Sequence, residues 1–255
     1  MAYFQGVFRS KVLQMDTAVN VAIPYDYYDD CGRPGRYDRV LYLLHGLKQN
    51  ADAWPRMSGA ERYANYHGYA LVMPEVQRSF YTDMAFGPRY FTYLTEELPA
   101  VISALYRLPT DRAHTFVGGL SMGGYGAMKC ALTRPDLFAG AMCFSSGFYM
   151  LDDPDWLGRA YYSKAELAGV IGSELRRAPA DDLERAMDAF PKDQKRPRLY
   201  VACGTEDPLY QKSARMRDAL RARGFAPEYE EWPGAHDWTF WDAALQKGMA
   251  YMAAE

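Results

Sequence analysis

The 255-residue sequence lacks a long apolar run, an excess of basic residues and any clustering of cysteines. No stretch approaches the roughly 20 uncharged residues that a membrane-spanning helix needs, so we expect no membrane segment. Lys and Arg together number 29 against 32 Asp and Glu, which gives a net charge of −3. Because no basic excess is available to neutralise phosphate groups, we also expect no nucleic-acid partner.

Metal-ligand patterns are missing as well. The cysteines stand apart from one another and from the four histidines, without the C-x-x-C or Cys–His spacings of zinc sites. We therefore expect no metal, and we expect the thiols to be reduced in a cytoplasmic protein, at Cys31, Cys130, Cys143 and Cys203. The first ten residues lack a basic flank followed by an apolar core, so we expect no signal peptide there.

Short, β-rich apolar runs alternate with helical patterns along the chain. The expected strands are Val19–Ile23, Arg39–Leu44, Tyr69–Met73, Thr115–Gly118, Ala139–Phe144, Arg198–Cys203 and Pro227–Trp232. Apolar residues at helical spacing predict helices around Leu94–Leu105, Met122–Thr133, Leu209–Leu220 and Trp238–Met252. Apolar strands that alternate with helices are typical of a mostly parallel sheet covered on both faces, so we expect one α/β domain over residues 1–255.

Residues 148–197 differ from the rest of the chain. They are densely charged and contain no strand-like run, and they fall between two expected strands. We interpret them as a small helical cap inserted over the carboxyl edge of the sheet. The alternative is that they form ordinary surface helices with solvated charged faces.

The pentapeptide Gly119-Leu-Ser-Met-Gly123 lies between an expected strand and an expected helix. Its G-x-S-x-G pattern in this context predicts a strained turn that lifts the Ser121 hydroxyl above the backbone at a helix N-terminus. The glycines two residues before and after Ser121 are needed because their backbones approach each other. No dinucleotide-binding G-x-G-x-x-G pattern can be read through these glycines, so we expect no such cofactor.

A serine hydroxyl needs a base to become a good nucleophile. In folds with this turn the partners follow in the order Ser, acid, His, and His236 is the one histidine after Ser121. Asp207, in a turn after an expected strand, is our choice for the acid that orients His236. Glu206 is its rival, and Asp207 could instead serve only as a turn residue before Pro208.

The oxyanion of a tetrahedral intermediate also needs hydrogen-bond donors. The backbone N–H of Met122, which follows the nucleophile, is one expected donor. The second is expected in the loop Leu43-Leu-His-Gly-Leu47, where Gly46 permits close approach and Leu47 supplies its N–H. We expect the side chain of His45 to brace this loop.

The sequence resembles the esterase D and tributyrin esterase branch of the α/β-hydrolases. This resemblance spans nearly the whole chain and is sharpest at four motifs: Leu44-His-Gly-Leu-Lys-Gln-Asn50, Gly119-Leu-Ser-Met-Gly-Gly-Tyr-Gly126, Cys203-Gly-Thr-Glu-Asp-Pro208 and Gly234-Ala-His-Asp-Trp238. It implies an α/β-hydrolase fold, with Ser121, Asp207 and His236 as catalytic residues and Leu47 and Met122 as oxyanion donors.

The same resemblance frames the expected activity. It implies a cofactor-free serine carboxylesterase that hydrolyses short-chain acyl esters through an acyl-enzyme. Alternatives are a feruloyl or acetylxylan esterase and, with less support, an S-formylglutathione hydrolase or a non-catalytic binding protein. Members that hydrolyse S-formylglutathione usually carry Cys-Thr after the oxyanion glycine, where this chain reads Leu-Lys-Gln-Asn, and His where it has Tyr125.

Aromatic residues make up 15% of the chain, with 21 tyrosines. Those near the loops of the expected site are candidate walls of a substrate pocket, together with Gly46: Trp54, Phe80, Tyr81, Phe148 and Trp238. We expect a small-molecule ester as the substrate. The aromatic content also leaves room for contacts between copies of the chain in a homo-oligomer.

Overall fold

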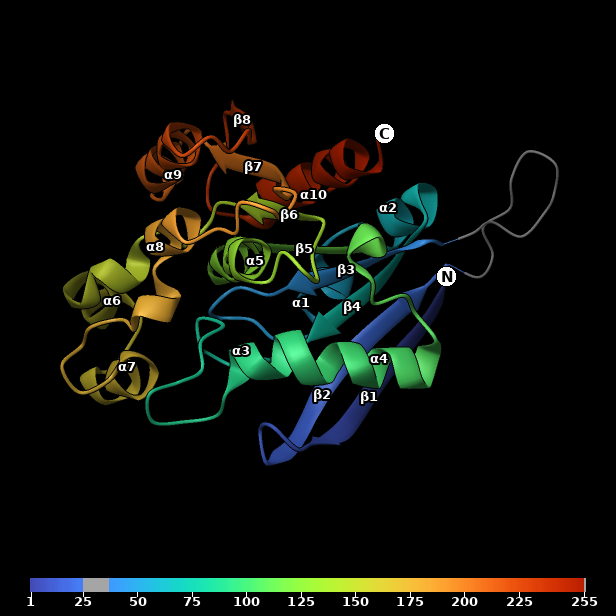
Figure 1. Cartoon of the computed structure of the whole chain (residues 1–255), viewed down its shortest axis with the longest axis horizontal. Coiled ribbons are helices and arrows are strands. Elements are labelled where there is room, and N and C mark those ends of the chain that lie inside the picture. The colour runs from blue at the N-terminus through green and yellow to red at the C-terminus, as the bar shows by residue number, and fades with distance from the viewer. Residues whose placement is uncertain (25–36, 255) are drawn as a thin grey trace, which may run out of the picture.

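The computed structural model describes residues 1–24 and 37–254, and Cys31 lies outside them. A sheet of eight strands runs through the molecule in the order β1-β2-β4-β3-β5-β6-β7-β8 (Figure 1). The strands are β1 (Ala2–Ser10), β2 (Met15–Ile23), β3 (Arg39–Leu44), β4 (Tyr69–Pro74), β5 (Thr115–Leu120), β6 (Gly140–Phe144), β7 (Arg198–Gly204) and β8 (Glu228–Trp232). Neighbours from β4 to β8 are parallel, whereas β2 pairs antiparallel with both β1 and β4.

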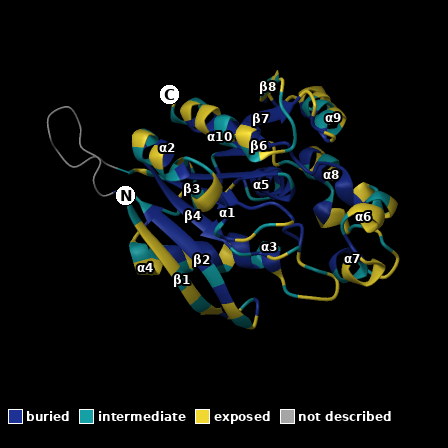
Figure 2. Ribbon diagram, turned by 180° about the vertical axis from the view of Figure 1, so that it is seen from behind, coloured by how far each residue is buried: buried dark blue, intermediate teal, exposed yellow. Residues whose placement is uncertain are grey.

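All seven expected strands are present, and their bounds shift by a few residues. Strand β1 was not expected, because it has no continuous apolar run. It lies at the sheet edge with most of its residues exposed or half-buried, and Figure 2 shows it lighter than the buried central strands. An edge strand of this kind carries little of the periodic burial that marks a strand in sequence.

The helices follow the expected pattern, with several additional short ones. They are α1 (Ala53–Met57), α2 (Ala60–His67), α3 (Tyr90–Thr92), α4 (Leu98–Tyr106), α5 (Met122–Thr133), α6 (Pro154–Ala160), α7 (Lys164–Ile171), α8 (Leu183–Asp188), α9 (Tyr210–Ala222) and α10 (Trp238–Ala253). A π-helical turn over Tyr93–Glu97 joins α3 to α4. Leu105, placed on the apolar face of that helix by its spacing, is 65% exposed because α4 turns this side outward, so that detail was wrong.

Two apolar cores lie on opposite faces of the sheet. In β3, Leu41 and Leu43 point to the face covered by α1, α2 and α10. Val40 and Tyr42 point to the other face, which α4, α5 and α9 cover. The predicted α/β fold, with helices on both faces of a mostly parallel sheet, is therefore confirmed.

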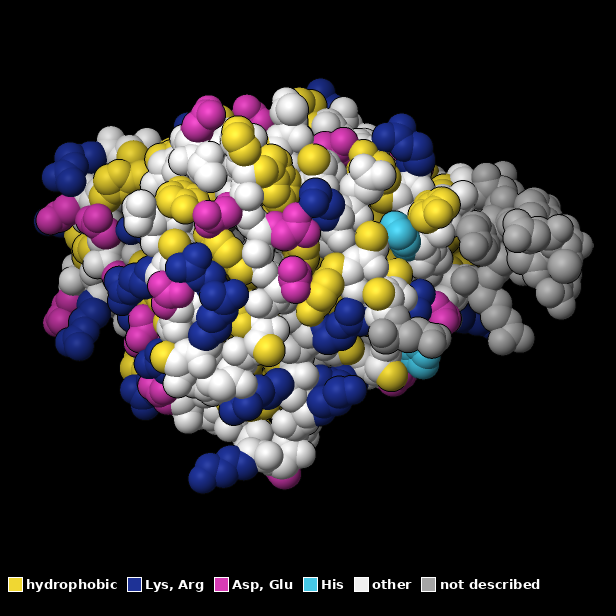
Figure 3. All heavy atoms as spheres, turned by 90° about the horizontal axis from the view of Figure 1, so that it is seen from above, with side chains coloured by type: hydrophobic (Ala, Val, Ile, Leu, Met, Phe, Trp, Pro, Cys, Tyr) yellow, Lys and Arg dark blue, Asp and Glu magenta, His cyan; other side chains and the backbone are white. Residues whose placement is uncertain are grey.

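The described surface mixes charges of both signs, and acidic and basic side chains stand beside each other on the face seen in Figure 3. Within residues 1–24 and 37–254, no helix combines the length and apolarity needed to cross a bilayer. The described thiols of Cys130, Cys143 and Cys203 are free and buried in the cores.

Candidate active site

Ser121 sits between β5 and α5 in a backbone conformation that L-residues rarely adopt, with φ 53° and ψ −117°. Hydrogen bonds hold this strained residue in place. Its N–H donates to the carbonyl of Phe144 at 2.9 Å, and its carbonyl accepts from the N–H groups of Gly124, Tyr125 and Gly147. The neighbouring strand and the first turn of α5 therefore fix the direction in which the hydroxyl points.

The glycines around Ser121 are required by close backbone contacts. A Cβ on Gly119 would lie 2.7 Å from the carbonyl oxygen of Gly123. A Cβ on Gly123 would meet the carbonyl oxygens of Leu44 and His45, the second at 2.8 Å. The serine turn is thus packed directly against the end of β3, as the spacing of the glycines predicted.

Replacing Gly123 with alanine is expected to harm both folding and activity. The new methyl group would press on two backbone carbonyls, which can move only by displacing the loop after β3. Overpacking of this kind costs on the order of 1–3 kcal/mol, so the melting temperature should fall by several degrees. A displaced loop should also lower kcat/KM by about 10²-fold.

Gly158→Ala in α6 is the matched control, because no atom outside the surrounding helix backbone lies within 4 Å of the place that a Cβ would take there, and a helical alanine is tolerated. Thermal melts and ester hydrolysis should show no loss for this variant. Equal behaviour of the two alanine variants would contradict the packing argument.

His236 and Asp207 reach Ser121 from two adjacent loops. His236 Nε2 lies 3.1 Å from Ser121 Oγ, and His236 Nδ1 lies 2.8 Å from an oxygen of Asp207. The two loops are in direct contact, since a Cβ added to Gly204 would collide with the carbonyl group of Gly234. Three side chains that are far apart in sequence are therefore joined by hydrogen bonds in one line.

The carboxylate of Asp207 is enclosed and well supported. Its side chain is fully buried, and it accepts a hydrogen bond from the Leu209 N–H at 2.7 Å. Burial alone would raise the pKa of Asp207, but the hydrogen bond and charge of His236 and the Leu209 N–H lower it overall. Asp207 is therefore ionised at neutral pH and accepts from Nδ1–H, which leaves Nε2 as the acceptor that faces the Ser121 hydroxyl. Glu206, its rival, is exposed.

The loop after β3 is braced by the side chains on either side of it. The side-chain oxygen of Gln49 accepts a hydrogen bond from the Gly46 N–H at 2.9 Å, and the backbone N–H of Gln49 donates to the Gly46 carbonyl. His45 Nε2 accepts from the Val76 N–H at 3.2 Å, so its Nδ1 carries the proton that is donated to the Gly46 carbonyl at 2.8 Å. The expected bracing role of His45 agrees with these contacts, whereas the role of Gln49 had no signal in the sequence.

The loop after β3 and the serine turn each contribute to one cavity a residue whose backbone N–H has no protein partner in the described chain. Leu47 and Met122 both line it together with Ser121. The N–H of Met122 begins α5 and has no carbonyl partner earlier in the helix. In the part of the chain that the structure describes, neither amide donates to another protein group.

The cavity beside Ser121 has a volume of about 240 Å³. Aromatic and apolar side chains make most of its wall: Phe80, Leu120, Met122, Met150, Trp156, Tyr161, Pro208, Leu209 and Trp241. Of the pocket residues predicted from sequence, Gly46 and Phe80 do line it. Met150, Trp156 and Tyr161 were not predicted, since nothing in the sequence shows which side chains of residues 148–197 point inward.

Four predicted pocket residues do not line the cavity, and this corrects the sequence analysis. Trp54 is buried and donates from Nε1 to the Leu44 carbonyl, and its ring packs edge-on against Trp238. The Tyr81 hydroxyl is committed to the His45 carbonyl at 2.9 Å, and Phe148 is fully buried in the core. Trp241, one helical turn beyond Trp238, takes the expected position instead, edge-on to the ring of His236 at 4.9 Å.

Residues 148–197 are fastened to the helix that follows Ser121. Lys129 of α5, which is buried, donates to Asp181 at 2.5 Å and to the Tyr81 carbonyl at 3.1 Å. Tyr125, also on α5, donates its hydroxyl proton to the Asp181 carbonyl at 2.6 Å. Removing one partner of such a buried pair typically costs about 3–5 kcal/mol, so the segment is firmly tied at this point.

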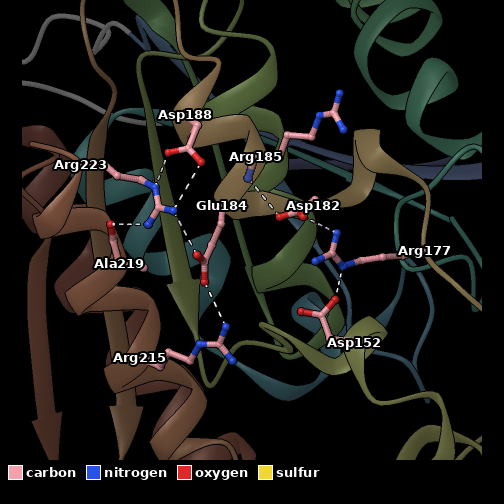
Figure 4. A network of polar contacts seen from close by, with 9 residues as sticks. All are labelled: Asp152, Arg177, Asp182, Glu184, Arg185, Asp188, Arg215, Ala219 and Arg223. Atoms are coloured by element: carbon pink, nitrogen blue, oxygen red, sulfur yellow. Dashed lines mark hydrogen bonds and ion pairs between the residues drawn. The ribbon is translucent and has the colours of Figure 1, made fainter.

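A second set of ion pairs joins the same segment to α9 (Figure 4). Arg223, which directly follows α9, contacts Asp188 at 2.6 Å and Glu184 at 3.1 Å, and Glu184 also forms an ion pair with Arg215 of α9. Within the segment, Arg177 bridges Asp152 and Asp182. These contacts fix the segment relative to the turn that carries Asp207, because α9 follows that turn directly.

Comparison with known proteins agrees with this architecture. A model of the family described as "Putative esterase" matches residues 10–252. The chain belongs to this esterase family. Within the described residues of this esterase, no group of three or more His, Cys, Asp or Glu side chains is arranged to hold a metal ion.

Several known proteins are similar to this esterase over their full length. An acetyl esterase from Caldicellulosiruptor saccharolyticus is 29% identical, and the alignment covers 99% of this chain and 98% of that protein. The substrate-bound structure of fluorophosphonate-binding serine hydrolase F from Staphylococcus aureus is 30% identical with a TM-score of 0.87, covering 100% and 99% of the two chains. An S-formylglutathione hydrolase from the same organism is 31% identical with a TM-score of 0.85, covering 99% of each. The chain is accordingly a carboxylic ester hydrolase with an α/β-hydrolase fold.

Proposed function

We propose that Ser121, His236 and Asp207 are the catalytic triad of a serine carboxylesterase that hydrolyses short-chain acyl esters. The observation that carries this proposal is the unbroken line of hydrogen bonds from Asp207 through His236 to a hydroxyl on a strained turn. Structural ion pairs rarely combine a buried carboxylate, a half-buried imidazole and a serine at a cavity wall.

The reaction follows from the positions of the proton donors and acceptors. Ser121 Oγ attacks the acyl carbon while His236 Nε2 accepts its proton, and Asp207 stabilises the imidazolium that forms. The amides of Leu47 and Met122 donate to the oxyanion. His236 then protonates the leaving alcohol, and water attacks the acyl-enzyme by the same route to release the acid.

The size of the cavity supports short esters. Its volume of about 240 Å³ lies below the roughly 300 Å³ at which sites for drug-sized ligands begin. We propose that residues 148–197 act as the cap that closes it, since Met150, Trp156 and Tyr161 contribute to its wall. The acetyl esterase relative supports the same size class. The free, buried thiols support a cytoplasmic location.

A second candidate substrate class is favoured by the aromatic wall. Phe80, Trp156, Tyr161 and Trp241 could stack on a flat feruloyl group, as a feruloyl esterase would require. The absence of Cys-Thr after Gly46 counts against S-formylglutathione.

A panel of esters tests the proposal. We expect kcat/KM for p-nitrophenyl esters to be highest from C2 to C4 and to fall about tenfold or more by C8, because the longer chain exceeds the enclosed volume. Methyl ferulate and acetylated xylan are measured beside them. A maximum at C8 would contradict the small-cavity argument, and a higher kcat/KM on methyl ferulate would favour the feruloyl class.

A further inference from the structure

Among the described residues of the cavity wall, Lys48 is the one with a permanently charged side chain, and it has no task in the proposed mechanism. Ser121 and His236 are engaged with each other, and the oxygen of Gln49 is held by the Gly46 N–H. The ammonium of Lys48 takes no part in these contacts, and no carboxylate is found among the described residues that line the cavity. The wall therefore carries one fixed positive charge and no negative charge to balance it.

The position of Lys48 is set by its neighbours in the loop. It directly follows Leu47, and the hydrogen bonds between Gly46 and Gln49 close the backbone around it. Its Nζ lies 4.8 Å from the centre of the Tyr161 ring, and Tyr161, which directly follows α6, also lines the cavity. This contact links the exposed side chain of Lys48, in the loop after β3, to residues 148–197.

Nearby carboxylates do not neutralise this charge. Glu166 of α7 lies five residues after Tyr161 in the sequence, and its carboxylate oxygen lies 3.4 Å from Nε of Arg78. Arg78 also donates to the Tyr161 carbonyl. Over residues 1–24 and 37–254, Lys48 itself has no ion-pair partner. An ammonium that is held over an aromatic ring beside a reactive site is free to bind an anionic group on a substrate.

We infer that Lys48 is a specificity residue that selects esters carrying a second, anionic group such as a carboxylate. This inference rests on the proposed function, because it assigns a substrate class to the same site. Lys48 makes and breaks no bond in the reaction, and it attracts the anionic end of the substrate while Ser121 attacks the ester. The carboxylate can belong to the acyl part or to the alcohol part of the ester.

Two pairs of substrates, each an anionic ester and a neutral ester of the same size, distinguish a carboxylate on the acyl part from one on the alcohol part. The acyl pair is monoethyl glutarate and its neutral amide, ethyl glutaramate. The alcohol pair is 4-acetoxybenzoate and 4-acetoxybenzamide. For each enzyme, the ratio of kcat/KM for the anionic over the neutral ester is measured, so that any general change in activity cancels.

The Lys48→Met variant should lower this ratio about fivefold for at least one pair, the size expected for one ion pair near the surface. Lys48→Glu should lower it further, and Lys48→Arg should keep it within about twofold because the charge remains. In the wild type, the ratio should also fall as NaCl rises from ~0.05 to ~0.5 M, and it should change little in Lys48→Met. The affected pair identifies which part of the ester carries the anion.

Lys195→Met is the matched control. Lys195 is exposed and lies just before the start of β7, whereas the site residues follow the carboxyl ends of the parallel strands. Its ratio should equal that of the wild type. If Lys48→Met and Lys195→Met change the ratio equally, or if neither changes it, the inference is wrong while Ser121-dependent hydrolysis of the neutral esters still supports the proposed function. If the neutral esters are not hydrolysed through Ser121, the proposed function fails and the inference fails with it.

Discussion

Ser121→Ala should lower kcat for a short p-nitrophenyl ester by on the order of 10⁶. The variant loses the atom that attacks the acyl carbon, and the water that could replace it is neither aligned nor covalently held. The remaining activity should come from the oxyanion donors and from binding alone. Removing His236 as well should lower kcat by no more than a fewfold, because the two groups act as one unit.

The Ser121→Ala protein should fold normally. Alanine adopts the same positive φ at a similar cost, and the hydrogen bonds at this turn come from backbone groups. A thermal melt should therefore match the wild type within a few degrees. This separates a loss of chemistry from a loss of structure.

Ser173→Ala is the matched control, since Ser173 is exposed and does not line the cavity. It should retain full activity and should still be labelled by a fluorophosphonate probe, whereas Ser121→Ala should not be labelled. Substantial turnover by purified Ser121→Ala, or labelling of it at the wild-type rate, would show that another residue is the nucleophile.

Much of the fold was predictable because its signals are local. The buried strands of a parallel sheet are continuously apolar, and the glycines of the serine turn report close backbone contacts directly. Pro135 stands two residues after the end of α5, where a helix cannot continue, and Gly224, with φ +77°, is the left-handed residue that follows α9. Strand β1 was missed because it lies exposed at the sheet edge and therefore has no continuous apolar run.

Part of the site was also predictable from local sequence signals, and part of it was not. Ser121, Asp207 and His236 were predictable because each follows a strand or precedes a helix in a fixed order along the chain. The pocket wall was not, because the choice between Trp238 and Trp241 depends on the rotation of α10 against the sheet. The roles of Gln49 and Lys48 were not predictable either, because they depend on the conformation of the loop after β3.

Asp207→Asn should lower kcat by about 10⁴-fold, although it preserves the size of the side chain. One oxygen of Asp207 accepts from the Leu209 N–H and the other faces His236 Nδ1. In the variant, the amide oxygen must remain on the Leu209 N–H, because the amide nitrogen cannot accept that bond. The NH₂ group then faces Nδ1 and donates to it, so the ring proton moves to Nε2. A protonated Nε2 can no longer accept the proton of Ser121.

The pH dependence of this variant follows from the charge that it removes. The pKa of Asp207 is lowered in the folded protein, so the carboxylate adds stability at pH values above its unfolded pKa of about 3.9, and this stability is lost as the pH falls through the lower folded value. The wild type should therefore melt at a higher temperature than Asp207→Asn from pH 5 to pH 8, and the gap should close only in stronger acid.

Glu206→Gln provides the control and tests the rival acid at the same time. Glu206 is exposed, and its contact with Gly234 is made by the backbone N–H, which the substitution leaves in place. Its kcat should stay within about twofold of the wild type, because an exposed carboxylate outside the hydrogen-bonded line contributes little to catalysis. A large loss in Glu206→Gln together with near-normal activity in Asp207→Asn would transfer the role of the acid to Glu206, and the tautomer argument would then be wrong.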